Sequence, residues 1–235
     1  MQKMIEKIKR FVRNPTEIIK SCEWTLFKKR RRNRLNNLDF SIIASNCVGT
    51  MIYHDLGTPY LSPTINLAIE MDDFVRFAKN LEWYMEQEIV ELKGEQEYPA
   101  GMLGDIKINF VHYETFEEGV LKWEERKKRI NWDNLFLIGS ERDGCTYETI
   151  QRFDQLPFEN KVIFTHVRYP GIPSAYYIEG FEDKEELGMI LNYKKQFLRR
   201  RYLDDFDYVA FLNSGLNSAV KQPEYIGKED RRRSV

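Results

Sequence analysis

The chain has 235 residues, with 36 Lys and Arg against 37 Asp and Glu, and three cysteines. This length can bury one large core or two small ones without disulfides, and Cys22, Cys47 and Cys145 are spaced as in proteins of a reducing compartment, so we expect a cytoplasmic protein. No apolar run is long enough for a signal peptide or approaches the roughly 20 residues that span a bilayer.

The charge is divided unevenly between a basic arm and an acidic body. Residues 1–38 hold twelve basic and three acidic side chains, whereas residues 39–235 hold 24 basic and 34 acidic ones. Apolar residues at near-helical spacing predict a short amphipathic helix over residues 3–13. The six charges from Lys28 to Arg34 repel one another, which predicts an exposed linker or an exposed helical face. We therefore divide the chain into a basic amphipathic arm (1–37), a domain (38–215) and a C-terminal tail (216–235).

Short apolar runs alternate with longer amphipathic stretches from residue 38 onward. This pattern predicts an α/β fold with a mostly parallel sheet covered by helices, as one unit or as two small packed subdomains. Strands are expected at residues 40–44, 65–69, 106–111, 135–138, 162–165, 176–178 and 208–212. Helices are expected at residues 72–89, at 116–130 after a capping box formed by Thr115 and Glu118, and after Thr146 and Asp183. Residues 94–104, which contain a proline and three glycines, predict a long loop or a subdomain boundary.

The stretch around Cys47 is the most suggestive for chemistry. An apolar strand runs through Ser45, Asn46 and Cys47 into an expected helix, where the macrodipole and free N–H groups favour a thiolate or a bound phosphate. The alternative is a buried Cys47 that fills a tight strand-to-helix turn, with Gly49 allowing close packing. His54 lies seven residues beyond Cys47, about 10 Å along the helix axis, which is too far for direct proton transfer.

A second group of polar residues follows the ends of expected strands. His112 ends one strand, Arg142 and Asp143 follow another, and His166 with Arg168 follow a third. Open α/β sheets bind ligands at the carboxyl ends of their strands, so these residues are expected to converge on one edge. We take as catalytic candidates Cys47, His112, Asp143 and His166, and as ligand-binding candidates Ser45, Asn46, His54, Arg142 and Arg168. The alternatives are hydrogen-bonded structural histidines and a local pair of Arg142 with Asp143 before a turn at Gly144.

Metal and nucleotide-cofactor sites are not indicated by any motif. The cysteines and histidines lack the spacing of zinc ligands, and the chain has neither a Walker A sequence nor a GxGxxG fingerprint. We expect no metal and no cofactor.

Two motifs resemble those of a known bacterial family. One reads Ala44-Ser45-Asn46-Cys47-Val48-Gly49 and the other reads Pro59-Tyr60-Leu61-Ser62-Pro63-Thr64. They are similar to the Ser-Asn-Asn-Cys-Trp-Gly and Pro-Tyr-x-Ser-Pro-Thr segments of a family of unknown function that is commonly labelled exopolysaccharide biosynthesis protein. In this chain Val48 replaces the family's Trp. The resemblance spans about residues 38–213, so it leaves out the basic arm.

The resemblance implies a role in the synthesis of a bacterial surface polysaccharide. One hypothesis is a transferase that acts on a sugar nucleotide or a lipid-linked sugar, with a phosphorylated sugar or glycan bound near Cys47 and Arg142. The alternative is a non-catalytic accessory protein that binds a glycan or a synthase. The polybasic run from Lys28 to Arg34 predicts peripheral attachment to an anionic membrane at its inner face. A nucleic-acid partner is not expected, because the body is acidic and no nucleic-acid-binding motif is present.

Overall fold

The computed structural model describes residues 15–94, 97–195 and 200–216. The helix expected over residues 3–13 and nearly all of the predicted tail lie outside these residues. Within them, no helix is both long enough and apolar enough to cross a bilayer.

A parallel sheet of four strands forms the centre of the fold. Its strands are β1 (Ser41–Ala44), β5 (Leu135–Ser140), β6 (Lys161–Thr165) and β7 (Ala175–Tyr177), paired in that order. All four were expected, β7 from the strand predicted at residues 176–178. The runs of β1, β5 and β6 are buried on both faces, as parallel strands between helices should be. The expected α/β class is confirmed.

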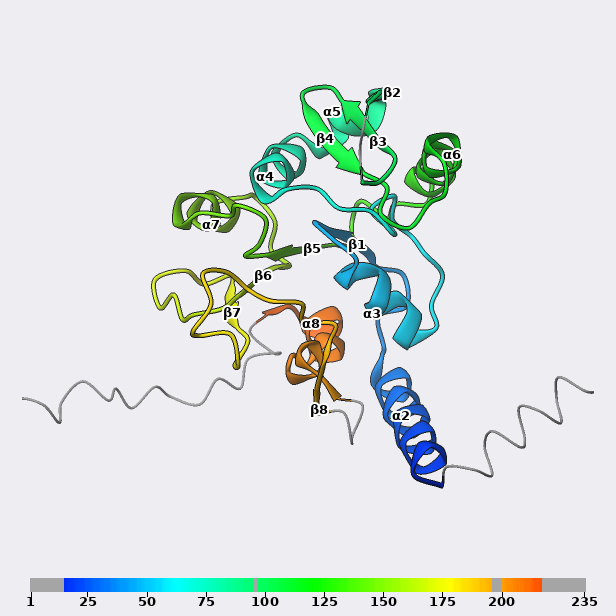
Figure 1. The fold of residues 1–235 in the computed structure, drawn as a ribbon, viewed down its shortest axis with the longest axis vertical. Helices are drawn as coiled ribbons and strands as arrows, with labels where there is room; N and C mark the ends of the chain where they lie inside the picture. Colours follow the sequence, from blue (N-terminus) through cyan, green and yellow to red (C-terminus); the bar gives the residue numbers. More distant parts are fainter. Residues whose placement is uncertain (1–14, 95–96, 196–199, 217–235) are drawn as a thin grey trace, which may run out of the picture.

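Helices cover both faces of this sheet (Figure 1). Ile42, Phe136 and Phe164 belong to one apolar core, together with residues of α3 (Val48–Leu56) and α8 (Tyr208–Ser214). Ile43, Leu137 and Ile163 belong to the other, with residues of α4 (Met71–Lys79) and α7 (Tyr147–Asp154). The alternation arises because successive side chains of a strand point to opposite faces.

An antiparallel sheet extends the second core. It contains β2 (Ile89–Glu91), β3 (Ala100–Leu103) and β4 (Ile106–Asn109), flanked by α5 (Leu81–Glu86) and α6 (Phe116–Lys127). The loop predicted at residues 94–104 therefore includes a strand, and the strand predicted at 106–111 belongs to this sheet rather than to the parallel one. A third, two-stranded sheet joins β8 (Tyr193–Lys195) to β9 (Arg200–Arg201), which leads into the 3-10 helix η2 (Tyr202–Asp205).

Several element predictions were wrong. Residues 208–212 are helical, because Asp207 caps α8 through the backbone N–H of Ala210, and a short apolar run does not distinguish a buried strand from a buried helix. Residues 65–69 form one isolated bridge, from Ala68 to Asn109. The helix expected over 72–89 is interrupted at Asn80, and the described residues directly after Asp183, 184–195, contain no helix. The helices that begin after Thr115 and Thr146 are confirmed, and both threonines accept a backbone N–H as N-caps.

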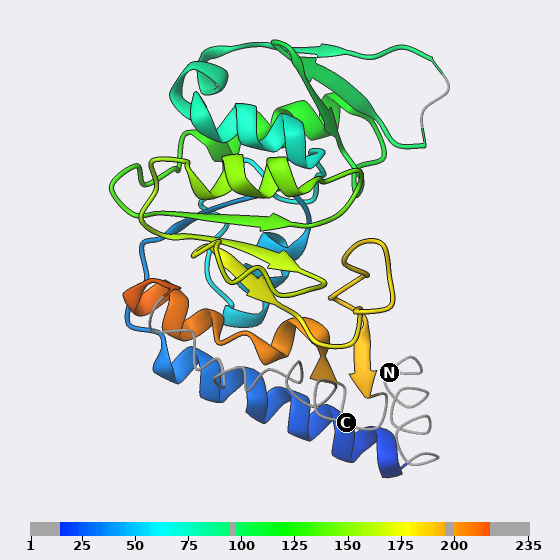
Figure 2. The ribbon, with the colours of Figure 1, turned by 90° about the vertical axis from the view of Figure 1, so that its left-hand side faces the viewer.

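Helix α2 (Pro15–Arg34) lies along the outside of the molecule, next to α3 and α8 (Figure 2). The polybasic run is the last part of this helix. Arg31 is buried, and its guanidinium pairs with Asp204 at 3.4 Å and donates to the Asp204 carbonyl at 3.0 Å. The run is therefore not a linker, and one side of it is packed against the domain.

Strand β1 is an edge strand whose free backbone groups are bonded by side chains. The Tyr53 hydroxyl accepts the Ile42 N–H at 3.0 Å and donates to the Phe40 carbonyl at 3.1 Å. The Thr64 hydroxyl accepts the Ala44 N–H at 3.0 Å. The Pro-Tyr-x-Ser-Pro-Thr segment thus has a structural role, because it covers an edge that would otherwise present unpaired donors.

Candidate functional site

A cavity of about 490 Å³ lies at the carboxyl ends of β1 and β5, and we call it the edge cavity. Its polar lining comes from four segments of the chain, one of which contributes Glu97 and Tyr98 before β3. Asn46 and Cys47 follow β1, Arg142 and Asp143 follow β5, and His112 follows β4. Residues 188–191 close another side with mainly apolar groups. The volume suits a small organic ligand, and the position is where open α/β sheets bind such ligands.

Cys47 is the N-cap residue of α3, as the expected strand-to-helix junction requires. Its thiol, however, is largely buried, with Sγ 4.0 Å from the Leu67 carbonyl oxygen. Burial raises the pKa of the thiol to about 11, because a thiolate would lose its hydration there. The expected thiolate is therefore not favoured in this structure, since desolvation outweighs any helix-terminus effect.

The residues beside Cys47 shape the turn. The Asn46 side-chain oxygen accepts the Val48 N–H at 3.1 Å, which fixes the entry into α3. Gly49 packs so closely on β1 that a Cβ atom there would lie 2.8 Å from the Ala44 Cβ. The Asn-Cys-x-Gly motif therefore has a packing explanation, and the predicted close approach at Gly49 is confirmed.

Two buried hydroxyls at the ends of adjacent strands have no hydrogen-bond partner in the described part of the chain. They belong to Ser45, directly after β1, and to Ser140, the last residue of β5. Each residue is 2% exposed, and Ser140 lines the edge cavity. Buried polar atoms in native proteins nearly always have a partner, so the Ser140 hydroxyl is a group that a bound ligand can satisfy.

The turn after β5 holds Arg142 above the cavity. The Arg142 N–H donates to the Ser140 carbonyl at 2.8 Å, and Asp143 adopts a left-handed φ of 55° before Gly144. The predicted local ion pair is present but long, with 3.9 Å between the guanidinium and the Asp143 carboxylate. The Arg142 guanidinium is therefore only loosely engaged and can contact an anionic ligand.

Glu141 organises the neighbouring loop and was absent from the predicted site residues. Its buried carboxylate accepts the His166 N–H at 2.8 Å and the Tyr169 hydroxyl at 2.5 Å, and lies 2.6 Å from His166 Nδ1. Burial and this carboxylate raise the pKa of the Tyr169 hydroxyl. Its position directly after β5 could have marked Glu141 as a candidate, because the other candidates were also chosen for their positions at strand ends. Ser140 and Arg142 line the cavity and Glu141 does not, as the alternation of side chains along extended backbone predicts.

The structure does not bring all the predicted site residues together. Cys47, Asn46, His112, Arg142 and Asp143 line the edge cavity, and Ser45 lies next to this group in sequence. His112 arrives from the antiparallel sheet, not from a neighbouring parallel strand as we had expected.

Three other predicted residues do not line the cavity. His54 is exposed near the far end of α3, with its ring 3.6 Å from Asp55. His166 is held by Glu141, and the exposed Arg168 lies over the Tyr177 ring at 4.5 Å. His54 misses the site because it lies seven residues, or about two helical turns, beyond Cys47.

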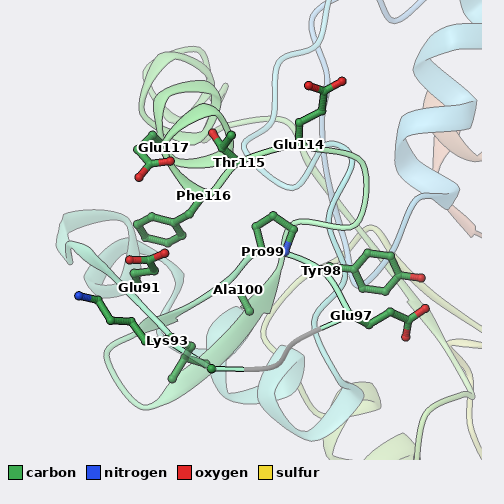
Figure 3. A pocket seen from close by; sticks show the side chains of 12 residues that line it. Glu91, Lys93, Glu97, Tyr98, Pro99, Ala100, Glu114, Thr115, Phe116 and Glu117 are labelled. Atoms are coloured by element: carbon green, nitrogen blue, oxygen red, sulfur yellow. The ribbon is translucent and has the colours of Figure 1, made fainter.

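A second cavity, of about 540 Å³, shares two lining residues with the edge cavity (Figure 3). Glu97 and Tyr98 line both cavities, while Glu91, Lys93 and Phe116 line only the second. Four glutamates and one lysine line this second cavity, whereas Glu97, Asp143 and one arginine line the edge cavity, so the edge cavity is the less unfavourable of the two for phosphate. Within the described residues, no cluster of three His, Cys, Asp or Glu side chains could hold a metal ion.

These features define a mixed α/β protein with a ligand-sized cavity at the carboxyl edge of its parallel sheet, lined by polar groups on one side and by mainly apolar groups on another. Residues 18–213 match the model of the family described as Domain of unknown function (DUF1919), and the chain belongs to this family. A protein of Haemophilus influenzae described as "Uncharacterized protein" is 41% identical over 204 residues, which cover 85% of this chain and 98% of that protein. The family match begins inside the basic arm, in agreement with the packing of α2 on the domain.

Proposed function

We propose that the edge cavity binds a phosphorylated sugar and that the protein is a transferase in the synthesis of a bacterial surface polysaccharide. The observation that carries the proposal is the lining of one cavity by a loosely paired guanidinium, an unpartnered hydroxyl and an imidazole, contributed by Arg142, Ser140 and His112. The pathway is suggested by the resemblance of the Asn-Cys-x-Gly and Pro-Tyr-x-Ser-Pro-Thr segments to proteins labelled with exopolysaccharide biosynthesis.

Each group has a role in this proposal. Arg142 contacts the phosphate, because a guanidinium offers several donors in one plane. The Ser140 hydroxyl and the Asn46 amide bond the sugar, and the Tyr98 ring stacks on it. His112 or the Asp143 carboxylate accepts the proton of an attacking hydroxyl, since both are beside the cavity and both types act as general bases. Cys47 contributes shape rather than a nucleophile, because its thiol stays protonated at neutral pH.

A binding screen tests the proposal. Purified protein is incubated with UDP-glucose, UDP-N-acetylglucosamine and undecaprenyl phosphate, and thermal unfolding is followed for each. A ligand present at 100 times its Kd stabilises the folded state by about 2.7 kcal/mol, which is readily seen as a shift in Tm. Arg142→Gln should weaken binding of the hit tenfold or more, because it removes a charge-assisted hydrogen bond.

The matched control is Arg129→Gln, which removes the same charge from an exposed position after α6. It should bind the hit as the unmodified protein does. Equal affinities for the Arg142 and Arg129 variants would place the ligand elsewhere and refute the assignment of the edge cavity.

A second candidate is a non-catalytic accessory protein that binds a glycan or a synthase. The protonated Cys47 and the apolar wall at residues 188–191 favour it, because neither supplies chemistry. Release of UDP from a bound sugar nucleotide distinguishes the two candidates. Binding without release, over a range of glycan acceptors, would support the accessory role.

A further inference from the structure

Helix α2 divides the polybasic run into two sets of charges. On the inner side Arg31 is buried against Asp204, and near the helix end Arg34 pairs with Asp207 at 2.5 Å. Lys29 and Arg30 are exposed, and neither forms an ion pair with the described part of the chain. The packing of the helix therefore decides which of the six charges are available to a partner.

The available charges share a face with an exposed apolar residue. Leu26, Lys29, Arg30 and Asn33 recur at the spacing that places side chains on one side of a helix, and Leu26 is 53% exposed. Arg31, which packs towards the domain, lies about 100° or more around the helix from each of these four residues. We call these four residues the outer face of α2.

A groove of about 410 Å³ borders the outer face. Leu26 and Arg30 line it together with Glu23, Trp24, Phe27 and Arg200. The Trp24 and Phe27 rings are stacked, with centroids 5.3 Å apart, and Arg200 is half-exposed. The groove thus combines aromatic and aliphatic walls with the guanidinium groups of Arg30 and Arg200 and with one carboxylate, and the Arg200 group is paired with Asp205 at 3.4 Å.

We propose that the outer face of α2 and this groove bind the surface of an anionic phospholipid bilayer. Lysine and arginine attract the phosphates of anionic lipids, whereas an exposed leucine and a tryptophan edge partition into the interface between headgroups and acyl chains. Nucleic acid would use the charges but gains nothing from the exposed Leu26, and the rest of the chain is acidic. Helix α2 lies on the outside of the molecule, so a flat surface can reach it (Figure 2).

Co-sedimentation of the full-length protein with vesicles tests this proposal. Vesicles of phosphatidylcholine with 30% phosphatidylglycerol should bind the protein at low ionic strength, and binding should weaken steeply towards physiological salt. Vesicles of phosphatidylcholine alone should bind it far less. Each basic residue near such a surface contributes about 1 kcal/mol, so Lys29→Gln/Arg30→Gln should lower the partition coefficient about 30-fold.

The matched control is Lys128→Gln/Arg129→Gln, which removes two exposed charges after α6, at the other end of the molecule from α2 (Figure 1). It should change the partition coefficient less than threefold. Leu26→Ala should weaken binding to anionic vesicles, because it removes the apolar side chain that enters the bilayer interface. Any weak, salt-sensitive binding to duplex DNA should be the same in this variant as in the unmodified protein. Equal losses in the two double variants, binding to neutral vesicles as tight as to anionic ones, or binding to DNA in preference to vesicles would overturn the proposal. Circular dichroism of each variant verifies that it is folded.

Discussion

Two regions of this molecule in which arginine side chains lie next to carboxylates differ in burial and in how closely the charges are paired. In the first, which we call the buried ion cluster, Arg31 and Arg201 surround Asp55 and Asp204, and all four are less than 10% exposed. In the second, at the edge cavity, Arg142 faces Asp143 at 3.9 Å and both remain partly exposed. The cluster joins distant segments of the chain, whereas the cavity leaves its charges loosely paired. A buried charge must be matched by the protein itself, and an exposed one can be matched by a ligand.

The buried ion cluster connects α2, α3, β9 and η2. The Arg201 guanidinium contacts Asp55 and lies 2.8 Å from the Asp204 carboxylate, which also accepts the Arg201 N–H at 2.8 Å. These two carboxylates raise the pKa of Arg201 against the opposing effect of burial, so the guanidinium stays charged. The cluster therefore explains why part of a polybasic run is folded into the domain.

Breaking the cluster should have the largest effect on stability. Asp204→Asn removes the carboxylate that neutralises two buried guanidinium groups, and the free energy of unfolding in urea should fall by about 3–5 kcal/mol. Asp143→Asn removes the same charge at the edge cavity and should cost less than about 1 kcal/mol, because Asp143 is exposed. Similar losses for both variants would mean that the two regions do not differ as described.

The reactivity of Cys47 gives the next largest effect. With its pKa raised to about 11, the thiol should react with iodoacetamide at pH 8 about 100-fold more slowly than in the urea-unfolded chain. The rate should rise about tenfold for each pH unit between 7 and 9.5. Mass spectrometry resolves Cys47 from Cys145, whose pKa burial raises to about 12. A native rate close to the unfolded one would restore the thiolate hypothesis.

The same shift fixes the sign of a stability change with pH. The folded state holds the Cys47 proton up to about pH 11, whereas an unfolded cysteine releases it near pH 9.0. The stabilising contribution is therefore complete below pH 9 and is lost as the pH rises from 9 to 11. In the Cys47→Ser variant, the free energy of unfolding should therefore fall less between pH 9 and pH 11 than it does in the unmodified protein.

Substitution of Glu141 should have an intermediate effect on the free energy of unfolding. Glu141→Gln replaces a buried carboxylate that accepts from the His166 and Tyr169 groups, and we expect a loss of about 1–3 kcal/mol in unfolding free energy. Glu186→Gln, at a less buried carboxylate that accepts the Asp143 N–H, should change stability by less than about 0.5 kcal/mol. Hydrogen exchange at the His166 backbone amide, which donates to Glu141, should be faster in the Glu141→Gln variant and so shows where the structure is loosened. Unaltered exchange in the Glu141 variant would contradict its role in this loop.

Ser140 should give the smallest effect on stability and the most informative one on ligands. Ser140→Ala removes a buried hydroxyl that has no partner among the described residues, so the free energy of unfolding should stay within about 1 kcal/mol or increase. The same variant should bind the ligand found in the thermal-shift screen more weakly. Ser174→Ala is a matched control, because its hydroxyl is also buried and unpartnered but does not line the edge cavity. Equal ligand affinities for the two variants would remove Ser140 from the site.

Sequence patterns determined the features that depend on neighbouring residues. The four parallel strands β1, β5, β6 and β7 were predicted from short apolar runs, and the starts of α6 and α7 were predicted from Thr115 and Thr146. The junction at Cys47 and the turn at Arg142 were also predictable, because a strand end followed by small polar residues or a glycine can be recognised locally.

Tertiary structure alone decided the rest, because burial and pairing depend on residues far apart in the chain. The helix at residues 208–212, the separate sheet that contains β4 and the burial of Arg31 against a carboxylate 173 positions away all arise from such contacts. The pKa of Cys47 shows this dependence on tertiary structure most clearly. Its helix N-terminus was visible in the sequence, but the desolvation that keeps the thiol protonated exists only once the segments around it have packed.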